Sequence, residues 1–363
     1  MIIDYFELYT AKLKLKKPFI TSLGVIEFSD HIFLKVYSES GEFGWGECAP
    51  THDINGETIE TCLAVSKQLT DSIIGISCYS HSLIYEKLNS VIYGHQSIKS
   101  AIDIACYDLA SKSKKLPLYN YLGGKINKKI YTDYTVSLND VDKMVEQAEQ
   151  IVKKGFKIIK VKLGDDGKKD IERIKHIRKC IGDDKQIRID ANQGWNIEEA
   201  IDTLKNIDKY NIEYCEEPIN RDLSFRLNEV KESSPVKIMA DESLFTSYDA
   251  EMMVHGNHCD MFNLKIGKHG GLFETKKIVS IAEENNIPMQ VGGFIESKII
   301  FTVNCHLGHT SNLIKFFDCD SPLFHELNPI VDGLEYKNDW ELSLPNSNGI
   351  GVDIEEDFLK NST

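Results

Sequence analysis

Five charged side chains in the middle of the chain combine the ligands of a metal site with a pair of bases. Each follows a short apolar run, and they recur at intervals of 28, 26, 25 and 24 residues: Lys162, Asp190, Glu216, Asp241 and Lys265. Three carboxylates suit Mg²⁺ as ligands, and a lysine that has lost its proton can act as a base. Two such bases beside a metal ion could work on opposite faces of one bound molecule. The spacing therefore predicts an enzyme with a divalent-metal site.

The residues around these five need a separate interpretation. Each acid alone could cap a helix or lie in a solvent-exposed loop, but neighbouring strands lie about 4.8 Å apart, so three acids at successive strand ends can converge. Glu217 points to the opposite side of its strand from Glu216 and is not a predicted ligand. Lys160 shares a face with Lys162, whereas Lys268 is expected to be a solvated lysine of a loop. Mutual repulsion and the nearby cation are expected to lower the pKa of the two lysine bases.

The elements that must position these groups alternate between strand and helix. From about residue 130, helical patterns separate strand runs that end near eight residues: Ser137, Lys162, Asp190, Glu216, Asp241, Lys265, Gly293 and Asp320. Eight parallel strands with helices between them predict an α/β fold, a modified (β/α) TIM-type barrel over residues 126–322. In such barrels the chemistry takes place at the carboxyl ends of the strands.

The two ends of the chain follow other patterns. The first 50 residues alternate apolar and polar side chains in two or three runs, and helical patterns follow them up to residue 125. Strands followed by helices predict an α+β domain over residues 1–125. Residues 323–363 contain turn residues and short strands, and we expect them to return and pack on that domain.

The composition of the chain disfavours several classes of binding partner. The net charge of -14 disfavours binding to nucleic acid or to an anionic membrane surface, and no apolar stretch approaches the length of a membrane span. The nine cysteines lack ligand spacing, so we expect buried free thiols rather than a disulfide framework. These features predict a soluble, cytoplasmic protein with a small-molecule substrate, and a homo-oligomer is possible.

Several motifs together resemble the enolase superfamily, and within it the muconate-lactonising subgroup. They are KVKLG, DAN, CEEP, ADES, NLK followed by GG, and the segment AIDIACYDLASK with LPLYNYLGG after it. The resemblance covers essentially the whole chain. It implies that residues 1–125 and the C-terminal segment form a capping domain over the barrel.

The resemblance also implies a reaction. A proton next to a carboxylate is abstracted, and the resulting enediolate is bound to Mg²⁺, one ion per subunit. By position, it makes Lys162 and Lys265 the acid/base pair and places Lys160 beside the substrate carboxylate. It makes three residues the metal ligands: Asp190, Glu216 and Asp241.

The segment IKFFDCDSPLF indicates which reaction of the family takes place. Asp318 and Asp320 share strand parity, so both can face the mouth of the barrel. They could cap the following turn, but two more carboxylates beside a metal site are costly unless they receive a cation, such as a substrate ammonium. The pair resembles the DxD motif of dipeptide epimerases, which hold the amino terminus of a dipeptide. Thr135 and Ile295 are expected to line the dipeptide backbone.

The prediction is therefore an isomerase, a Mg²⁺-dependent dipeptide epimerase. It would invert the α carbon of the second residue of an L-Ala-L-Xaa dipeptide by proton transfer between two bases. The alternatives are another enzyme of the subgroup (a cycloisomerase, an o-succinylbenzoate synthase or an N-acylamino-acid racemase) or a non-catalytic metal-binding relative. Gly24 stands where some alanyl-glutamate epimerases carry an arginine, so an acidic, an apolar or a cationic second side chain each stays possible.

Overall fold

The computed structural model describes residues 1–125 and 127–360, and an eight-stranded sheet lies at its centre. All of its strand pairs are parallel, in the order β12-β11-β10-β9-β8-β7-β6-β5. Its strands are β5 (Tyr134–Val136), β6 (Ile158–Lys162), β7 (Gln186–Asp190), β8 (Ile212–Glu216), β9 (Ile238–Ala240), β10 (Met261–Leu264), β11 (Met289–Val291) and β12 (Ile314–Phe317). Where the last strand meets the first, one hydrogen bond between backbone groups is present among the described residues: the amide of Asp133, just before β5, donates to the Phe317 carbonyl over 3.3 Å.

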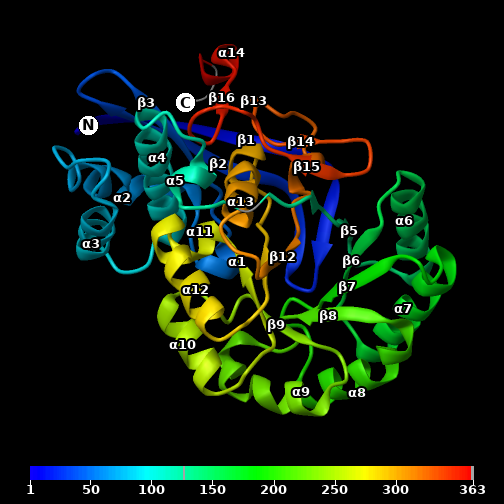
Figure 1. Cartoon of the computed structure of the whole chain (residues 1–363). Coiled ribbons are helices and arrows are strands. Elements are labelled where there is room, and N and C mark those ends of the chain that lie inside the picture. Colours follow the sequence, from blue (N-terminus) through cyan, green and yellow to red (C-terminus); the bar gives the residue numbers. More distant parts are fainter. Residues whose placement is uncertain (126, 361–363) are drawn as a thin grey trace.

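Helices run between consecutive strands, and Figure 1 shows most of them along the outer side of the curled sheet. They are α6 (Val141–Lys153), α7 (Gly167–Ile181), α8 (Ile197–Ile207), α9 (Leu227–Ser233), α10 (Ser247–His255), α11 (Ile266–His269), α12 (Leu272–Glu284) and α13 (Lys298–Gly308). In α8, for example, the Asn196 side chain accepts from the Glu199 amide at the start, and Ala200, Leu204 and Ile207 are buried on one face.

A second, antiparallel sheet covers one end of the barrel (Figure 1). It consists of β1 (Ile3–Thr21), β2 (Gly24–Ser38) and β3 (Phe43–Cys48), in that order. The helices after it are α1 (His52–Asn55), α2 (Ile59–Asp71), α3 (His81–Val91), α4 (Gln96–Ser113) and α5 (Leu118–Tyr121). Residues 97–111 of α4 are all buried, because this helix lies between the antiparallel sheet and the barrel.

The C-terminal segment touches both parts. It contains β13 (Ile330–Asp332), β14 (Glu335–Tyr336), β15 (Glu341–Ser343), β16 (Val352–Ile354) and α14 (Glu356–Lys360), and β15 pairs with β4 (Ile130–Tyr131). The Trp45 indole donates to Asp353 over 2.9 Å. On the barrel side, Trp340 stacks on Phe156 with ring centroids 3.8 Å apart.

The predicted fold class is confirmed, a modified (β/α) barrel with an α+β cap. Each barrel strand ends within three residues of its predicted end. The eighth strand is followed only by a short 3-10 turn (Ser321–Leu323) before the C-terminal segment begins. The division at residues 125 and 322 stays a prediction, because the last segment contacts both parts.

The cysteines differ in one respect from the expectation of buried thiols. All nine are free and eight are buried, but Cys180 is exposed. Its sulfur lies at the end of the amphipathic α7, on a helix whose opposite face packs on the barrel. Within residues 1–125 and 127–360, no helix combines the length and apolar character needed to cross a membrane.

Candidate active site

The three predicted metal ligands lie side by side at the ends of adjacent strands. Asp190 and Glu216 are the last residues of β7 and β8, and Asp241 follows β9 directly. The strand register pairs Lys162 with Asp190 and Asp190 with Glu216, so these groups stand at one height. All three carboxylates are fully buried.

Lysine ammonium groups contact this row of acids. Lys160 lies between two of them, with its Nζ 3.0 Å from Asp190 and 2.8 Å from Glu216. Lys162 lies 2.6 Å from Asp190 at one end of the row. Lys265 lies 2.6 Å from Asp241 at the other end. The two predicted bases therefore contact the two outer acids of the row.

The pKa values follow from burial and from these contacts. Burial alone would raise the pKa of Asp190 and Asp241, but the neighbouring lysines hold both below the usual range. For Glu216, burial and the charge of Asp190 raise the pKa to about 7. The lysines therefore outweigh burial for Asp190 and Asp241 but not for Glu216.

The acids that Lys265 contacts also change its pKa. Burial would lower the pKa of Lys265, but Asp241 and Glu216 raise it above the usual range. For Lys265, the direct contact with a carboxylate outweighs burial and the repulsion from Lys160, and a fall in pKa beside a bound cation stays a prediction.

A further lysine was assigned wrongly from the sequence. Lys268, expected to be solvated, is fully buried in α11. Its Nζ lies 2.7 Å from Asp241 Oδ1 and also donates to the Asp241 and Asn263 carbonyls. The single helical turn of α11 folds the side chain back under the row of acids, and a turn of four residues has no periodicity to reveal it.

The row of acids fits a hard cation. Its ligands are all carboxylate oxygens, and they come from a rigid set of strand ends. Asn263 and Gln290 donate to the two Glu216 oxygens over 2.8 and 3.2 Å and thereby orient them. Asp241 Oδ2 and Glu242 Oε2 are buried without a hydrogen-bond partner among the described residues, although Lys265 lies close to the former. In this structure, lysine ammonium groups balance the negative charge of these carboxylates.

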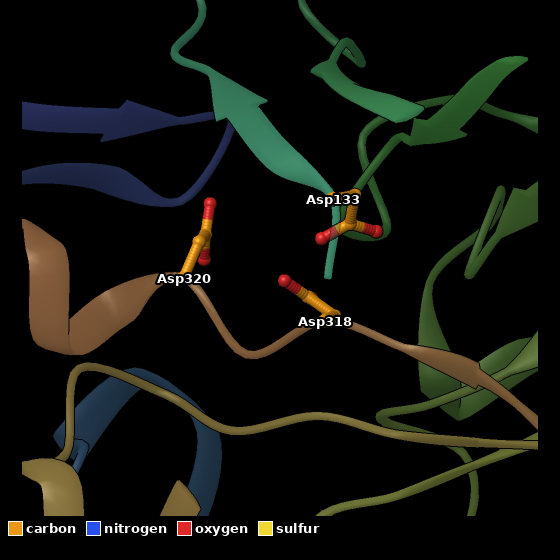
Figure 2. Close-up of side chains that lie close together, drawn as sticks. All are labelled: Asp133, Asp318 and Asp320. Atoms are coloured by element: carbon orange, nitrogen blue, oxygen red, sulfur yellow. The ribbon is translucent and has the colours of Figure 1, made fainter. Parts of the chain in front are cut away.

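A second group of acids lies where β12 meets β5. Oxygens of Asp133, Asp318 and Asp320 all lie within 4.8 Å of one another, and Figure 2 shows the three side chains converging. Lys160 lies 2.8 Å from Asp318, and the Thr135 amide donates to Asp320 over 2.7 Å. Burial and the charge of Asp318 raise the pKa of Asp320 to about 8. Such a group can receive a cation.

Asp133 was missed in the sequence. It is fully buried, and Arg188 lies 2.9 Å from one of its oxygens while the other lacks a hydrogen-bond partner in the described part of the chain. It immediately precedes β5, and its parity with Thr135 was the only signal that could have placed it at the mouth.

One cavity of about 720 Å³ joins the lysines to this second group of acids. On the barrel side its wall includes seven predicted site residues: Thr135, Lys160, Lys162, Lys265, Ile295, Asp318 and Asp320. The cap covers it with the turn between β1 and β2, including Phe19, Leu23 and Gly24, and with residues 49–54. Phe19 and Phe294 were not predicted, and their rings lie 5.7 Å from Lys162 and 5.0 Å from Lys265.

Comparison with known proteins agrees with this geometry. The model for "Mandelate racemase / muconate lactonizing enzyme, N-terminal domain" matches residues 6–123, and that for "Enolase C-terminal domain-like" matches residues 143–358. The D-Ala-D/L-Ala epimerase of Cytophaga hutchinsonii is 43% identical over 99% of this chain and 98% of its own. The L-Ala-D/L-Glu epimerase of Bacillus subtilis is 34% identical over 93% of each.

Solved structures point the same way. The dipeptide epimerase of Cytophaga hutchinsonii, in complex with Mg and the dipeptide D-Ala-L-Val, has a TM-score of 0.99 at 42% identity and covers 100% of this chain and 99% of its own. The relatives named here are epimerases, isomerases of the kind predicted from the sequence. The chain belongs to the mandelate racemase/muconate lactonizing enzyme family of the enolase superfamily.

Proposed function

We propose that the protein is a Mg²⁺-dependent dipeptide epimerase that inverts the α carbon of the second residue of an L-Ala-L-Xaa dipeptide. One observation carries the proposal: a single cavity holds two lysines on the outer members of a row of acids and a second group of acids that can receive an ammonium. Relatives whose solved structures contain Mg and a dipeptide support it.

The metal would be held by the row of acids at the strand ends, Asp190, Glu216 and Asp241. A Mg²⁺ ion bound there supplies positive charge that makes the carbon next to a substrate carboxylate more acidic. Lys160 touches two of these acids and also lines the cavity, so its ammonium can meet the same carboxylate. Lys162 and Lys265 would move the proton, one Nζ taking it and the other returning one from the opposite side.

The second group of acids would fix the other end of the substrate. A free amino terminus is an ammonium with three N–H donors, and Asp318 and Asp320 offer carboxylate oxygens to it. These acids could also hold a metal ion, and Lys160 contacts Asp318 as it contacts the row of acids, so Mg²⁺ titration of variants must distinguish the two sites. Thr135 and Ile295 lie on the wall between the two ends.

Deuterium incorporation tests the proposal. The protein with Mg²⁺ is incubated in D₂O with L-Ala-L-Glu, L-Ala-L-Val and L-Ala-L-Lys, and the products are analysed by mass spectrometry and chiral chromatography. Deuterium should appear on the α carbon of the second residue of at least one dipeptide, together with the inverted epimer. Absence of exchange from a wider dipeptide panel, while Mg²⁺ binding is measured, would contradict the proposal.

Two variants separate this function from other reactions of the family. Asp318→Asn with Asp320→Asn should raise the KM for a free dipeptide by about 100-fold, because each lost charged contact weakens binding of the ammonium. An enzyme whose substrate lacks an ammonium, such as an N-acylamino-acid racemase, should barely respond. Equal activity of the variants and the wild type on free dipeptides would favour that second class.

We also propose a location in the cytoplasm, supported by nine free cysteines, which suit a reducing compartment. The net charge of -14 supports a small-molecule partner rather than nucleic acid or an anionic membrane surface.

A further inference from the structure

One carboxylate of the capping sheet is buried against a barrel helix. Glu47 of β3 is 1% exposed, and its oxygens accept from the Ser297 amide over 2.6 Å and from the Ser297 hydroxyl over 2.8 Å. The Ile300 amide donates to it over 3.3 Å. These groups form the start of α13, whose first amides have no partner within the helix and whose dipole favours a negative charge. A residue of the cap thus caps a barrel helix 250 positions away.

Glu47 is held firmly on its own side. Gly44 and Gly46 alternate with it along β3, and they face α4. A Cβ on Gly44 would lie 2.2 Å from the Ala105 carbonyl oxygen, and one on Gly46 would lie 1.9 Å from that of Ala101. Strand and helix are therefore in backbone contact, and a side chain at either glycine would force β3 away from α4.

A chain of side chains connects Glu47 to the cavity wall. His31 Nδ1 lies 2.8 Å from Glu47, and His31 Nε2 lies 2.7 Å from the Ser29 hydroxyl. The Ser29 hydroxyl in turn lies 2.9 Å from Nε2 of His325, which follows the turn after β12. Ser29, His31, Glu47 and His325 are all buried, and Ser29 lines the cavity.

The segment just before Ser297 forms part of the cavity wall. Gly293, Phe294 and Ile295 line the cavity. The Ser321 hydroxyl donates to the Phe294 carbonyl over 2.7 Å, which ties the segment to the residues after β12. The other end of this segment is Ser297, at the start of α13, which Glu47 caps. The placement of Ile295 and of the Phe294 ring near Lys265 therefore depends on the cap.

We propose that Glu47 is a positioning residue for the reaction. It fixes the start of α13 and, through His31, Ser29 and His325, the wall segment 293–297 against the bound substrate. Its carboxylate touches neither the row of acids nor the lysines, so it acts through the wall. This inference rests on the proposed function, since the wall matters only if a substrate lies on it.

The chain offers a matched control for this role. Asp103 of α4 is a second buried carboxylate of the cap, and it accepts from the Leu272 and Phe273 amides over 2.6 and 3.2 Å at the start of α12. Glu47→Gln and Asp103→Asn both replace a cap carboxylate by its amide at the start of a barrel helix. Only Glu47 is tied to the wall segment 293–297.

The experiment measures kcat and KM for a dipeptide that the wild type epimerises, together with amide hydrogen exchange. Glu47→Gln should raise KM about tenfold, with kcat within about threefold of the wild type, because binding is weakened and the lysines stay in place. Exchange at the Ser297 and Ile300 amides should accelerate. Asp103→Asn should accelerate exchange at Leu272 and leave KM at the wild-type value.

A milder variant covers the case in which Glu47→Gln does not fold. Ser29→Ala removes the hydroxyl between the two histidines and leaves the cap of α13 intact, and it should raise KM about threefold. An unchanged KM in both variants, or an equal rise in Asp103→Asn, would overturn the positioning role. Wild-type protein that epimerises no dipeptide would instead overturn the proposed function, and hydrogen exchange at Ser297 would still decide whether Glu47 fixes α13.

Discussion

Four lysines supply the counter-charge to the row of acids, and they differ in what they touch. Lys160, Lys162 and Lys265 line the cavity, whereas Lys268 is fully buried beneath Asp241. A buried charge is costly unless it is paired, so each of these contacts is needed in the folded state. Because Lys268 occupies Asp241 Oδ1, the other oxygen is directed toward Lys265.

The assignment of the metal ligands leads to a first prediction. Asp190→Asn should lower the affinity for Mg²⁺ by more than about 100-fold, because a charged ligand is lost. Asp318→Asn should leave it within about threefold, because we propose that this acid receives the substrate ammonium and not the metal. Isothermal titration with Mg²⁺ gives both affinities and should return one ion per subunit. The reverse order of the two variants would move the metal to the group of Asp133, Asp318 and Asp320.

Removing the buried lysine should destabilise the protein. Lys268→Met leaves Asp241 Oδ1 without its partner, and breaking a buried pair costs about 3 kcal/mol of unfolding free energy. Lys277→Met is the control, because Lys277 pairs with Glu274 over the similar distance of 2.9 Å but is 42% exposed, and it should cost at most about 1 kcal/mol. Urea unfolding in EDTA gives both values. Equal losses would show that burial of Lys268 contributes little.

Among single residues, the sequence predicts the site residues that lie at the end of a strand and does not predict those that lie elsewhere. Lys162, Asp190 and Glu216 each end an apolar run, so their height in the sheet is readable from the sequence. The burial of Lys268 depends on a short turn between elements, and Asp133 precedes its strand. Neither position carries a periodic signal.

Among the elements, α13 depends most on residues from elsewhere in the chain. Glu47 caps its start, and near its end His306 joins it to two other segments. The Tyr119 amide of α5 donates to His306 Nδ1 over 3.2 Å, so Nε2 carries the proton and donates to the Ile350 carbonyl over 3.0 Å. Burial lowers the pKa of His306 to about 4.

The neutral state of His306 predicts a pH dependence of stability. The unfolded chain takes up the proton near pH 6.5 and the folded one only near pH 4, so this contribution is complete above about pH 6.5 and is lost as the pH falls toward 4. Between about pH 7.5 and pH 5 it amounts to about 2 kcal/mol. His306→Gln should lack that part of the slope in urea unfolding. His176→Gln, at an exposed histidine of α7, should keep the wild-type slope, and identical slopes in all three proteins would contradict the assignment.

The order of the elements could be predicted from the sequence because helical patterns alternate with apolar strand runs along the barrel. Amphipathic helices such as α6 and α8 separate apolar strands, and three of those strands, β6, β7 and β8, end in a charged residue. The end of the barrel was less readable. After β12 the described residues form short strands that pair within the segment, β13 with β16 and β14 with β15, and β15 also pairs with β4.

In the whole molecule, the C-terminal segment connects cap and barrel. The Ile350 amide donates to Asp108 of α4 over 2.7 Å, and the Leu118 amide donates to the Gly349 carbonyl over 2.8 Å. The Trp340 indole donates to the Lys154 carbonyl over 2.8 Å on the barrel side. The two parts therefore share one segment as well as the contacts of Glu47 and Asp103.

This arrangement predicts that cap and barrel unfold together. In the full chain, circular dichroism and tryptophan fluorescence should give one coincident thermal transition. Removal of residues 330–363 should separate the two probes into distinct transitions and lower the first midpoint by about 10 °C or more, because the shared strands and the Asp108 contacts are lost. A truncated protein that still unfolds in one step at the wild-type midpoint would show that the segment is dispensable.

The first and last strands of the ring meet at the hydrogen bond between Asp133 and Phe317. Side-chain hydrogen bonds of Asp320 and Thr132 also cross this junction, and the three aspartates lie over it. Arg188 and Lys160 balance part of their negative charge, at Asp133 and Asp318 respectively. A cation bound between the three aspartates would contact residues on both sides of the junction and would hold the two edge strands together. Binding of the substrate ammonium at this position would then also stabilise the closed barrel, whose strand ends carry the lysines.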